Sequence, residues 1–179
     1  MTVREILKVG RQDLIARDHE VLMKPSRAVE ADLALVGDIV TDLIDTMQAH
    51  PTCVGLAAPQ IGYSVTIAVV RKDVAEQERP LVLIDPIIEA LTGKTDGKSE
   101  ACMSLPGWCG LVKRKPKVEL SFSDGAGRQA SLRAEGYLSR VIQHEVDHLL
   151  GILYPFRMRS DDALVERQLA DKATTGMSS

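Results

Sequence analysis

The sequence predicts an α+β fold in which mostly antiparallel strands pack around a buried central helix. Three observations support this prediction: apolar residues repeat at helical spacing in two long segments, short β-branched runs lie between those segments, and a hairpin pattern precedes the second of them. The order of helix, strands, hairpin and helix is not the regular alternation that builds a parallel sheet. With 179 residues, of which 45% are hydrophobic, the chain is expected to form one domain over residues 1–179.

The first long helix is predicted over residues 26–50, because its apolar side chains recur every three or four positions between polar ones. Residues 53–62 follow Pro51 and contain too many small residues for an ordinary strand, yet they are too apolar for a solvated loop. We therefore interpret residues 53–62 as a binding loop. The helix prediction rests on the apolar positions Val29, Leu33, Val36, Val40, Leu43 and Met47.

Strands are predicted next at residues 65–70 and 81–84, because both segments are aliphatic or β-branched runs of strand length. The dipeptide Asp85-Pro86 is expected to end the second of these strands. Residues 100–106 predict a further short strand, which is expected to end at Pro106.

The C-terminal half begins with a predicted hairpin, in which residues 118–123 and 129–133 flank a glycine-containing turn. The second long helix is predicted over residues 135–151, since a glycine stands at its end. A last helix is predicted over residues 160–172, where a serine and two aspartates can cap the first turn. Residues 173–179 are small and polar and are expected to fray.

The net charge of the chain indicates which classes of binding partner to expect. A formal net charge of −3, without a long run of lysine or arginine, gives no electrostatic footprint for nucleic acid or an anionic membrane. Residues 1–8 are interrupted by charge too early for a secretory signal, and no stretch reaches the length of a membrane span. We therefore predict a cytoplasmic protein that binds neither nucleic acid nor membranes. In such a reducing compartment its three cysteines are more often ligands, nucleophiles or core residues than disulfides.

The most informative motif is HExxH, formed by His144, Glu145 and His148 in the second long helix. Residues four apart share one face of a helix, so both imidazoles can reach one metal ion while Glu145 contacts its water ligand. The alternative is a solvated helix whose histidines face water. Burial is favoured because apolar residues surround the motif at helical spacing, and buried imidazoles need a partner such as a metal ion. These apolar residues are Leu138, Val141, Ile142, Leu149 and Leu150.

A hydrolytic zinc or iron site usually has three protein ligands and one position for water. The third histidine of one HExxH subclass is missing, because Tyr154 stands six residues after His148. Glu166 could supply a carboxylate, although its segment is expected to be peripheral. Cys102 is the better candidate, because a thiolate binds zinc or ferrous iron well. From the residues alone both candidates stay open, and a cysteine taken alone is more often a core residue than a ligand.

Three separated segments resemble the motifs of the peptide deformylase family. Residues 54–60 (VGLAAPQ) resemble its GxGLAAxQ motif, residues 100–106 (EACMSLP) resemble EGCLS, and residues 143–149 (QHEVDHL) are similar to QHExDHL. The resemblance also includes the opening residues 3–10 and covers the chain from about residue 3 to about residue 157. Their order and spacing make the joint resemblance far more specific than HExxH alone.

The resemblance implies that residues 1–179 form a single catalytic domain, a hydrolase that removes the N-formyl group from the N-terminal formylmethionine of new polypeptides and releases formate. Glu145 would act as general base and then as general acid. The side chain of Gln60 and the backbone N–H of Met103 would stabilise the oxyanion. One divalent metal ion, Fe²⁺ as is typical of the family or Zn²⁺ in its place, would be held by Cys102, His144 and His148.

The implied substrate is an N-formylmethionyl peptide or nascent chain, which would pair in β-strand fashion with the backbone of Val54 and Gly55. Ala101 lies beside the cysteine ligand, where the backbone is expected to approach the substrate. Tyr137 and Val141 lie two turns and one turn before the first histidine, on the same helix face. They are candidates for the walls of the methionine pocket, although plain core positions would show the same spacing.

Four departures from the family pattern concern residues near this site. Cys53 and Ala101 replace glycines, which can restrict the loop or narrow the site, and Met103 replaces a leucine of similar volume. Cys109 stands where many relatives carry arginine, which removes a contact to substrate carbonyls. Two alternatives therefore stay open: a small metallopeptidase with Glu166 as third ligand, and a deformylase-like protein that binds N-terminal peptides without turnover.

Overall fold

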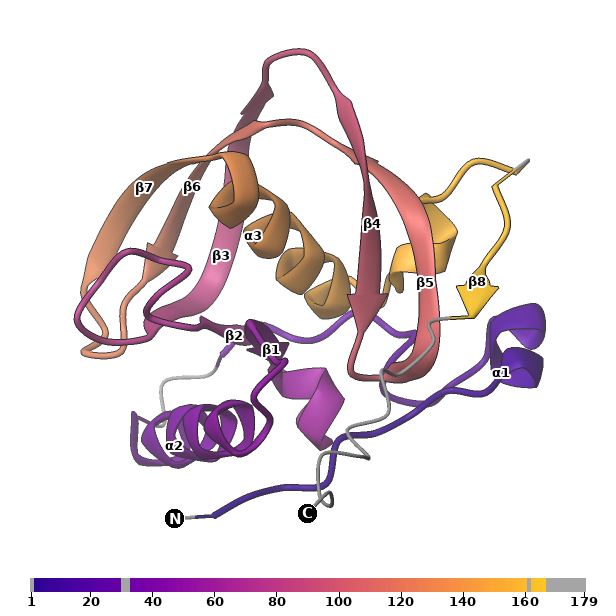
Figure 1. The fold of residues 1–179 in the computed structure, drawn as a ribbon. Helices are drawn as coiled ribbons and strands as arrows, with labels where there is room; N and C mark the ends of the chain where they lie inside the picture. Colours follow the sequence, from indigo (N-terminus) through magenta and orange to yellow (C-terminus); the bar gives the residue numbers. More distant parts are fainter. Residues whose placement is uncertain (1, 30–32, 161, 167–179) are drawn as a thin grey trace, which may run out of the picture.

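The computed structural model of the chain describes residues 2–29, 33–160 and 162–166, and it has two antiparallel sheets beside a central helix (Figure 1). Within these residues the larger sheet has the strand order β1-β2-β3-β6-β7 and the smaller has the order β4-β5-β8. The predicted α+β class is confirmed. The strands are β1 Gly55–Ala57, β2 Ile67–Val70, β3 Leu81–Thr92, β4 Asp96–Cys102, β5 Leu105–Arg114, β6 Lys117–Ser123, β7 Gln129–Glu135 and β8 Val165–Glu166. The helices are α1 Arg11–Ala16, α2 Leu33–Ala49 and α3 Gly136–Leu149, with 3₁₀ turns η1 Ala58–Ile61 and η2 Tyr154–Arg157.

The larger sheet separates two apolar cores, one formed with α2 and the other with α3. Successive side chains of a strand point to opposite faces of the sheet, so the residues of β2 divide between the two cores. Ile67 and Val69 belong to the cluster that contains Leu43 of α2, whereas Val70 belongs to the cluster that contains Ile142 of α3. The apolar side of α3 is therefore covered by this sheet.

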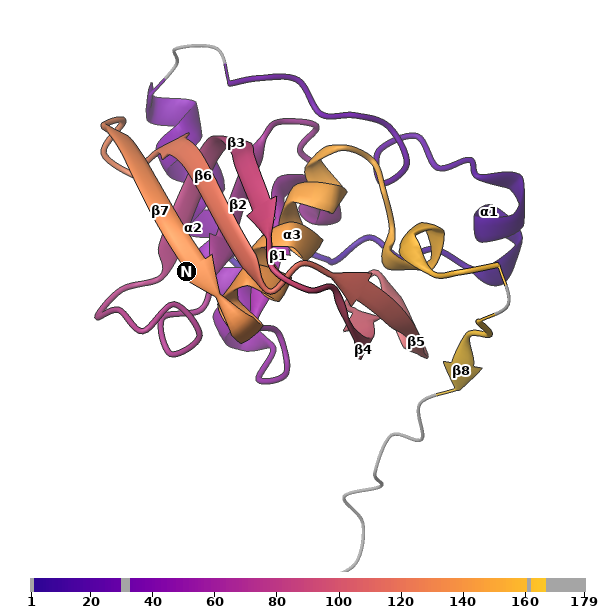
Figure 2. The ribbon, with the colours of Figure 1, turned by 90° about the horizontal axis from the view of Figure 1, so that it is seen from above.

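The other side of α3 faces the β4–β5 hairpin, which stands apart from β6 and β7 (Figure 2). This contact is polar, because Arg140 and His144 of α3 bind the carboxylate of Glu100 in β4. Polar residues of α3 are nevertheless buried, since the hairpin shields them from solvent. The helix thus carries its chemistry on a buried polar side between the two sheets.

The predicted first long helix is confirmed, but it begins at Leu33 instead of residue 26. Its expected first turn is extended, because Arg27 forms a parallel bridge with Val65 and its backbone N–H donates to the carbonyl of Ser64. Tertiary pairing with the chain before β2 thus overrides the helical periodicity of residues 26–29. Residues 30–32 of the predicted helix lie outside the described residues.

The strand predicted at residues 81–84 does not end at Asp85-Pro86 but continues to Thr92. The register with β6 shifts between Ile84 and Ile87, and Asp85 adopts a positive φ of 49°. The carboxylate of Asp85 is held by the backbone N–H of Val29 and the hydroxyl of Thr66. A bulge therefore accommodates the proline, which cannot donate a ladder hydrogen bond.

Pro106 likewise does not end the strand predicted at residues 100–106. That segment spans the end of β4, a tight turn and the start of β5, in which Pro106 is the second residue. The ladder is interrupted between the pairs Ala101–Cys109 and Cys102–Leu105, so Pro106 lies where no backbone donor is needed. At this interruption the chain turns, directly after Cys102.

The binding loop predicted at residues 53–62 is partly regular, because β1 pairs with β2 and is followed by η1. The hairpin of residues 118–123 and 129–133 is confirmed as β6 and β7, which pair throughout.

The second long helix is confirmed as α3, and Gly151 follows it with a φ of 72°. A side chain at Gly151 would approach the backbone of Lys24 to 2.6 Å, which explains the glycine.

The last helix predicted at residues 160–172 is wrong where the structure describes it. Val165 and Glu166 form β8, which pairs with Cys109 and Trp108 of β5. The open edge of β5 offers backbone partners that outweigh the local helix signals. The remainder of that predicted helix and the tail at 173–179 lie outside the described residues. None of the helices in the described part of the chain is long and apolar enough to cross a membrane.

Gly37 offers a test of the fold that does not involve the site. It lies on the exposed side of α2, and an added Cβ would meet no atom within 4 Å. Replacement by alanine removes backbone freedom from the unfolded chain and improves helix propensity, so Gly37→Ala is expected to raise the free energy of unfolding by about 0.5–1 kcal/mol. Urea denaturation measures this change. A lower midpoint would contradict the assignment of Gly37 to an exposed helix interior.

Candidate metal centre

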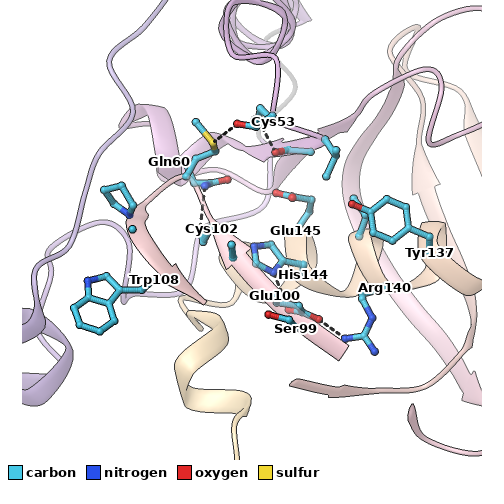
Figure 3. A pocket seen from close by; sticks show the side chains of 18 residues that line it. Cys53, Gln60, Ser99, Glu100, Cys102, Trp108, Tyr137, Arg140, His144 and Glu145 are labelled. Carbon is cyan, nitrogen blue, oxygen red and sulfur yellow. Dashed lines mark hydrogen bonds and ion pairs between the residues drawn. The ribbon is translucent and has the colours of Figure 1, made fainter. Parts of the chain in front are cut away.

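A cavity of about 300 Å³ opens between the loop before β1, the end of β4 and the polar side of α3 (Figure 3). Every site residue predicted from the sequence lines this cavity except His148, which is buried and does not line it. The structure therefore brings together segments that are far apart in the sequence. The predicted residues that line the cavity are Val54, Gly55, Gln60, Ala101, Cys102, Met103, Tyr137, Val141, His144 and Glu145.

Three of these side chains converge on one point. The ligand atoms of Cys102, His144 and His148 all lie within 4.8 Å of one another, and the Sγ of Cys102 lies 3.2 Å from the Nε2 of His148. The two histidines project from one face of α3 because they are four residues apart, and Cys102 is the last residue of β4. The residues that could hold a metal ion are thus one thiol and two imidazoles.

This donor set fits a borderline-soft divalent metal ion. A thiolate with two imidazoles suits zinc or ferrous iron. Burial alone would raise the pKa of the Cys102 thiol, but the neighbouring His148 and His144 outweigh burial and hold that pKa well below its ordinary value. The sulfur is therefore available as the anionic ligand that a metal ion requires.

Glu145 lies next to these donors with a buried carboxylate. Among the described residues no hydrogen-bond partner is found for its Oε2 or for the Nδ1 of His148. Burial raises the pKa of Glu145 to about 7, and the two histidines oppose this rise only in part. A Cβ at Gly55 would stand 2.5 Å from the Oε1 of Glu145, so only glycine lets the loop approach the carboxylate this closely.

Gln60 of η1 points its amide toward the sulfur of Cys102. Its Oε1 accepts from the backbone N–H of Ala57 at 2.9 Å, and its Nε2 lies 3.2 Å from the Oγ of Ser104 and 3.6 Å from the Sγ of Cys102. The first of these contacts fixes the side-chain amide with its N–H groups toward the site. Met103, which lies between Cys102 and Ser104 in the turn, also lines the cavity.

Glu100 was not assigned a role from the sequence, yet it anchors the first histidine. Its Oε2 accepts from the Nδ1 of His144 at 3.0 Å, while Arg114 donates to both carboxylate oxygens at 2.9 Å. Burial alone would raise the pKa of Glu100, but Arg114 and His144 hold it well below its ordinary value. Because Cys102 follows two residues later in β4, strand alternation places Glu100 on the same face, and that spacing could have indicated the role.

The residues that depart from the family pattern occupy different places. Cys53 is buried at the cavity and donates to the carbonyl of Gly55 at 3.1 Å, and burial raises its thiol pKa to about 12. Cys109 lies in β5 opposite Ala101. Glu166, the rival third ligand, is exposed in β8 and does not belong to the cluster of donors found among the described residues. Of the two candidates that the sequence left open, Cys102 and not Glu166 lies with the two histidines among the described residues.

Comparison with known proteins adds independent observations. The sequence model of a family described as polypeptide deformylase matches residues 11–163. A peptide deformylase from Chloroflexus aggregans is 37% identical over 172 residues, which cover 89% of each chain. Peptide deformylase 2 from Bordetella bronchiseptica is 36% identical over 163 residues, which cover 88% of each chain.

Solved structures show the same similarity in three dimensions. A peptide deformylase from Synechococcus elongatus in complex with actinonin has a TM-score of 0.76 and 33% identity, with coverage of 88% of this chain and 80% of that one. A peptide deformylase from Legionella pneumophila has a TM-score of 0.77 and 31% identity, with coverage of 89% of this chain and 88% of that one.

The donor set makes the role of Cys102 testable without any substrate. Cys102→Ala removes the only sulfur of the cluster, so the variant is expected to lose tight binding of one zinc or cobalt ion, which metal analysis after gel filtration measures. The cobalt form should also lose its sulfur-to-metal absorption band. Cys109→Ala is the matched control and should keep both. Stoichiometric zinc in the Cys102 variant would overturn the ligand assignment.

Proposed function

This chain belongs to the peptide deformylase family, and we propose that Cys102, His144 and His148 hold the metal ion at which it removes the formyl group of N-formylmethionyl peptides. Such an enzyme is a metal-dependent hydrolase that acts on newly made polypeptides and releases formate. The observation that carries the proposal is the Glu145 carboxylate, which lines the same cavity as Cys102 and His144, two of the three clustered donors. The single catalytic domain over residues 1–179 and the cytoplasmic location stay predictions.

The metal is proposed to be Fe²⁺, with Zn²⁺ as the alternative, because both accept a thiolate with two imidazoles. A divalent ion held there would act as a Lewis acid that activates water and polarises the formyl carbonyl. The surroundings support this assignment, since the Nδ1 of His144 is bound to Glu100 and its Nε2 is left for a ligand.

Glu145 is proposed to move the proton. As water attacks the formyl carbon, a new carbon–oxygen bond forms and the carboxylate of Glu145 accepts the proton that the water loses. When the carbon–nitrogen bond breaks, Glu145 gives this proton to the departing amine, so that formate and a free N-terminus result. The buried position of Glu145 and its unpartnered Oε2 among the described residues support this role.

Gln60 and the backbone N–H of Met103 are proposed to stabilise the oxyanion that forms during attack. The contact between the Nε2 of Gln60 and the Sγ of Cys102 is long, at 3.6 Å, and can be exchanged for a shorter bond to the developing negative oxygen. The bond from Ala57 holds the amide in the orientation that this requires.

The sheet topology supports β-strand pairing with an extended peptide. Within the described residues β1 and β4 are each the last strand of their sheet, so each has an edge without a partner strand. At the cavity β1 begins and β4 ends, and Val54, Gly55 and Ala101 lie there. We propose that the peptide backbone pairs with these edges, and that its methionine side chain lies against Tyr137 and Val141.

Replacement of Glu145 tests the proposed chemistry. Glu145→Ala should keep one metal ion but release formate from formyl-Met peptides roughly 10²–10⁴-fold more slowly, which is the usual contribution of a general acid and base. Glu78→Ala, at an exposed glutamate, is the control and should retain wild-type activity. Equal activity of the two variants would refute the role of Glu145. If the wild-type protein binds the peptide without releasing formate, the protein is a binding module.

Gly55→Ala tests the contact between the loop and Glu145. The added Cβ would lie 2.5 Å from the Oε1 of Glu145, so the carboxylate must move while the metal ligands keep their places. Displacement of a catalytic group by about 1 Å lowers kcat by roughly 10²-fold. Steady-state formate release should show this loss at unchanged metal content. Gly37→Ala, the same chemical change in α2, should leave kcat unaltered; a Gly55 variant of wild-type kcat would contradict the close contact.

A further inference from the structure

Arg140 is a buried cation one helical turn before His144, and neither the sequence motifs nor the proposed reaction assign it a role. We infer that Arg140 is a positioning residue that acts through Glu100: it fixes the carboxylate that orients His144 as a metal ligand. The inference rests on the proposed metal site. Arg140 lines the cavity, and Figure 3 shows its guanidinium directed toward Glu100.

The guanidinium of Arg140 bridges three points on the β4–β5 hairpin. Its first terminal nitrogen donates to the Oε1 of Glu100 at 2.6 Å and to the carbonyl of Val112 at 3.0 Å. Its second terminal nitrogen donates to Asp96, to the carbonyl at 3.2 Å and to Oδ1 at 2.9 Å. All four terminal N–H groups are thus used, and the side chain is only 6% exposed. Such a fork holds its partners in fixed geometry, which a single ammonium group cannot do.

Glu100 transmits this constraint to the first histidine. Its Oε1 receives Arg140 and the Nε of Arg114, and its Oε2 receives Arg114 and the Nδ1 of His144. Arg114 is also bound to Asp147 at 2.5 Å, so it divides its charge between two acids. Without Arg140, Glu100 would lose its shortest contact, at 2.6 Å, and among the described residues Arg114, which also binds Asp147, would be the one arginine left to oppose a shift of the carboxylate. The partner of a metal-bound histidine sets both its tautomer and its ring orientation.

The geometry also separates this role from simple packing. Arg140 and His144 lie on one face of α3, so a shift of Glu100 is felt at the ring that must face Cys102. A purely structural Arg140 would stabilise the contact between α3 and the hairpin without changing how tightly the three donors hold a metal ion. The two roles therefore predict different effects on metal release from folded protein.

The test uses zinc-loaded full-length protein and needs no substrate. Arg140→Gln is expected to transfer zinc to a chromophoric chelator about 10–100-fold faster than wild type. Loss of a residue that orients a metal ligand usually weakens metal binding by this factor. The cobalt form should show a changed visible spectrum. Arg157→Gln is the matched control, because Arg157 binds Asp147 but not Glu100, and its zinc transfer should stay within about twofold of wild type.

A second variant and a double-mutant comparison decide the route. Arg140→Lys keeps the charge but not the fork, and it should also release zinc faster; it replaces Arg140→Gln if that variant does not fold. In a Glu100→Gln background the Arg140 substitution should add little, because both act on the same contact. Wild-type release by folded Arg140→Gln and Arg140→Lys, or full additivity with Glu100→Gln, would overturn the inference. Wild-type protein that fails to retain zinc would instead overturn the proposed metal site.

Discussion

The contact between the carboxylate of Glu100 and the Nδ1 of His144 is the interaction on which the site depends. It joins β4, which carries the cysteine, to α3, which carries both histidines. The three donors can converge only if these two elements keep their separation. Burial of a carboxylate is unfavourable unless cations and donors surround it, and Arg114 and Arg140 meet this condition. The metal centre and the ion network are therefore parts of one buried polar layer between two apolar cores.

The sequence predicted the elements whose signal is local. Helical periodicity identified α3, and alternation with a glycine-containing turn identified the β6–β7 hairpin. It failed where distant partners override local rules: Asp85 is held by Val29 across a bulge, Pro106 lies where the ladder is interrupted, and the residues expected in a last helix pair with β5. A local sequence pattern contains no information about a pairing residue that is distant in the sequence.

The residues of the candidate site were easier to predict from the sequence than the residues that hold them in position. The HExxH spacing predicts that both histidines and Glu145 share one site, and the motif resemblance predicts that Gln60 and Cys102 lie at that site. Glu145, Gln60 and Cys102 do line one cavity. Arg114 carries no such signal, because it reaches Glu100 only through the pairing of β4 with β5. The reason for a glycine at position 55 is also visible only in three dimensions, since it is the distance to Glu145.

In the part of the chain that the structure describes, β1 and β4 each have an edge without a partner strand, and this has a consequence for selectivity. In the proposed binding mode these edges offer backbone amides and carbonyls, and so they meet atoms that every amino acid possesses. Discrimination then falls on the very first residue and on the small group attached to its nitrogen. A catalyst organised in this way can serve a whole proteome, because it is indifferent to most of what distinguishes one gene product from another.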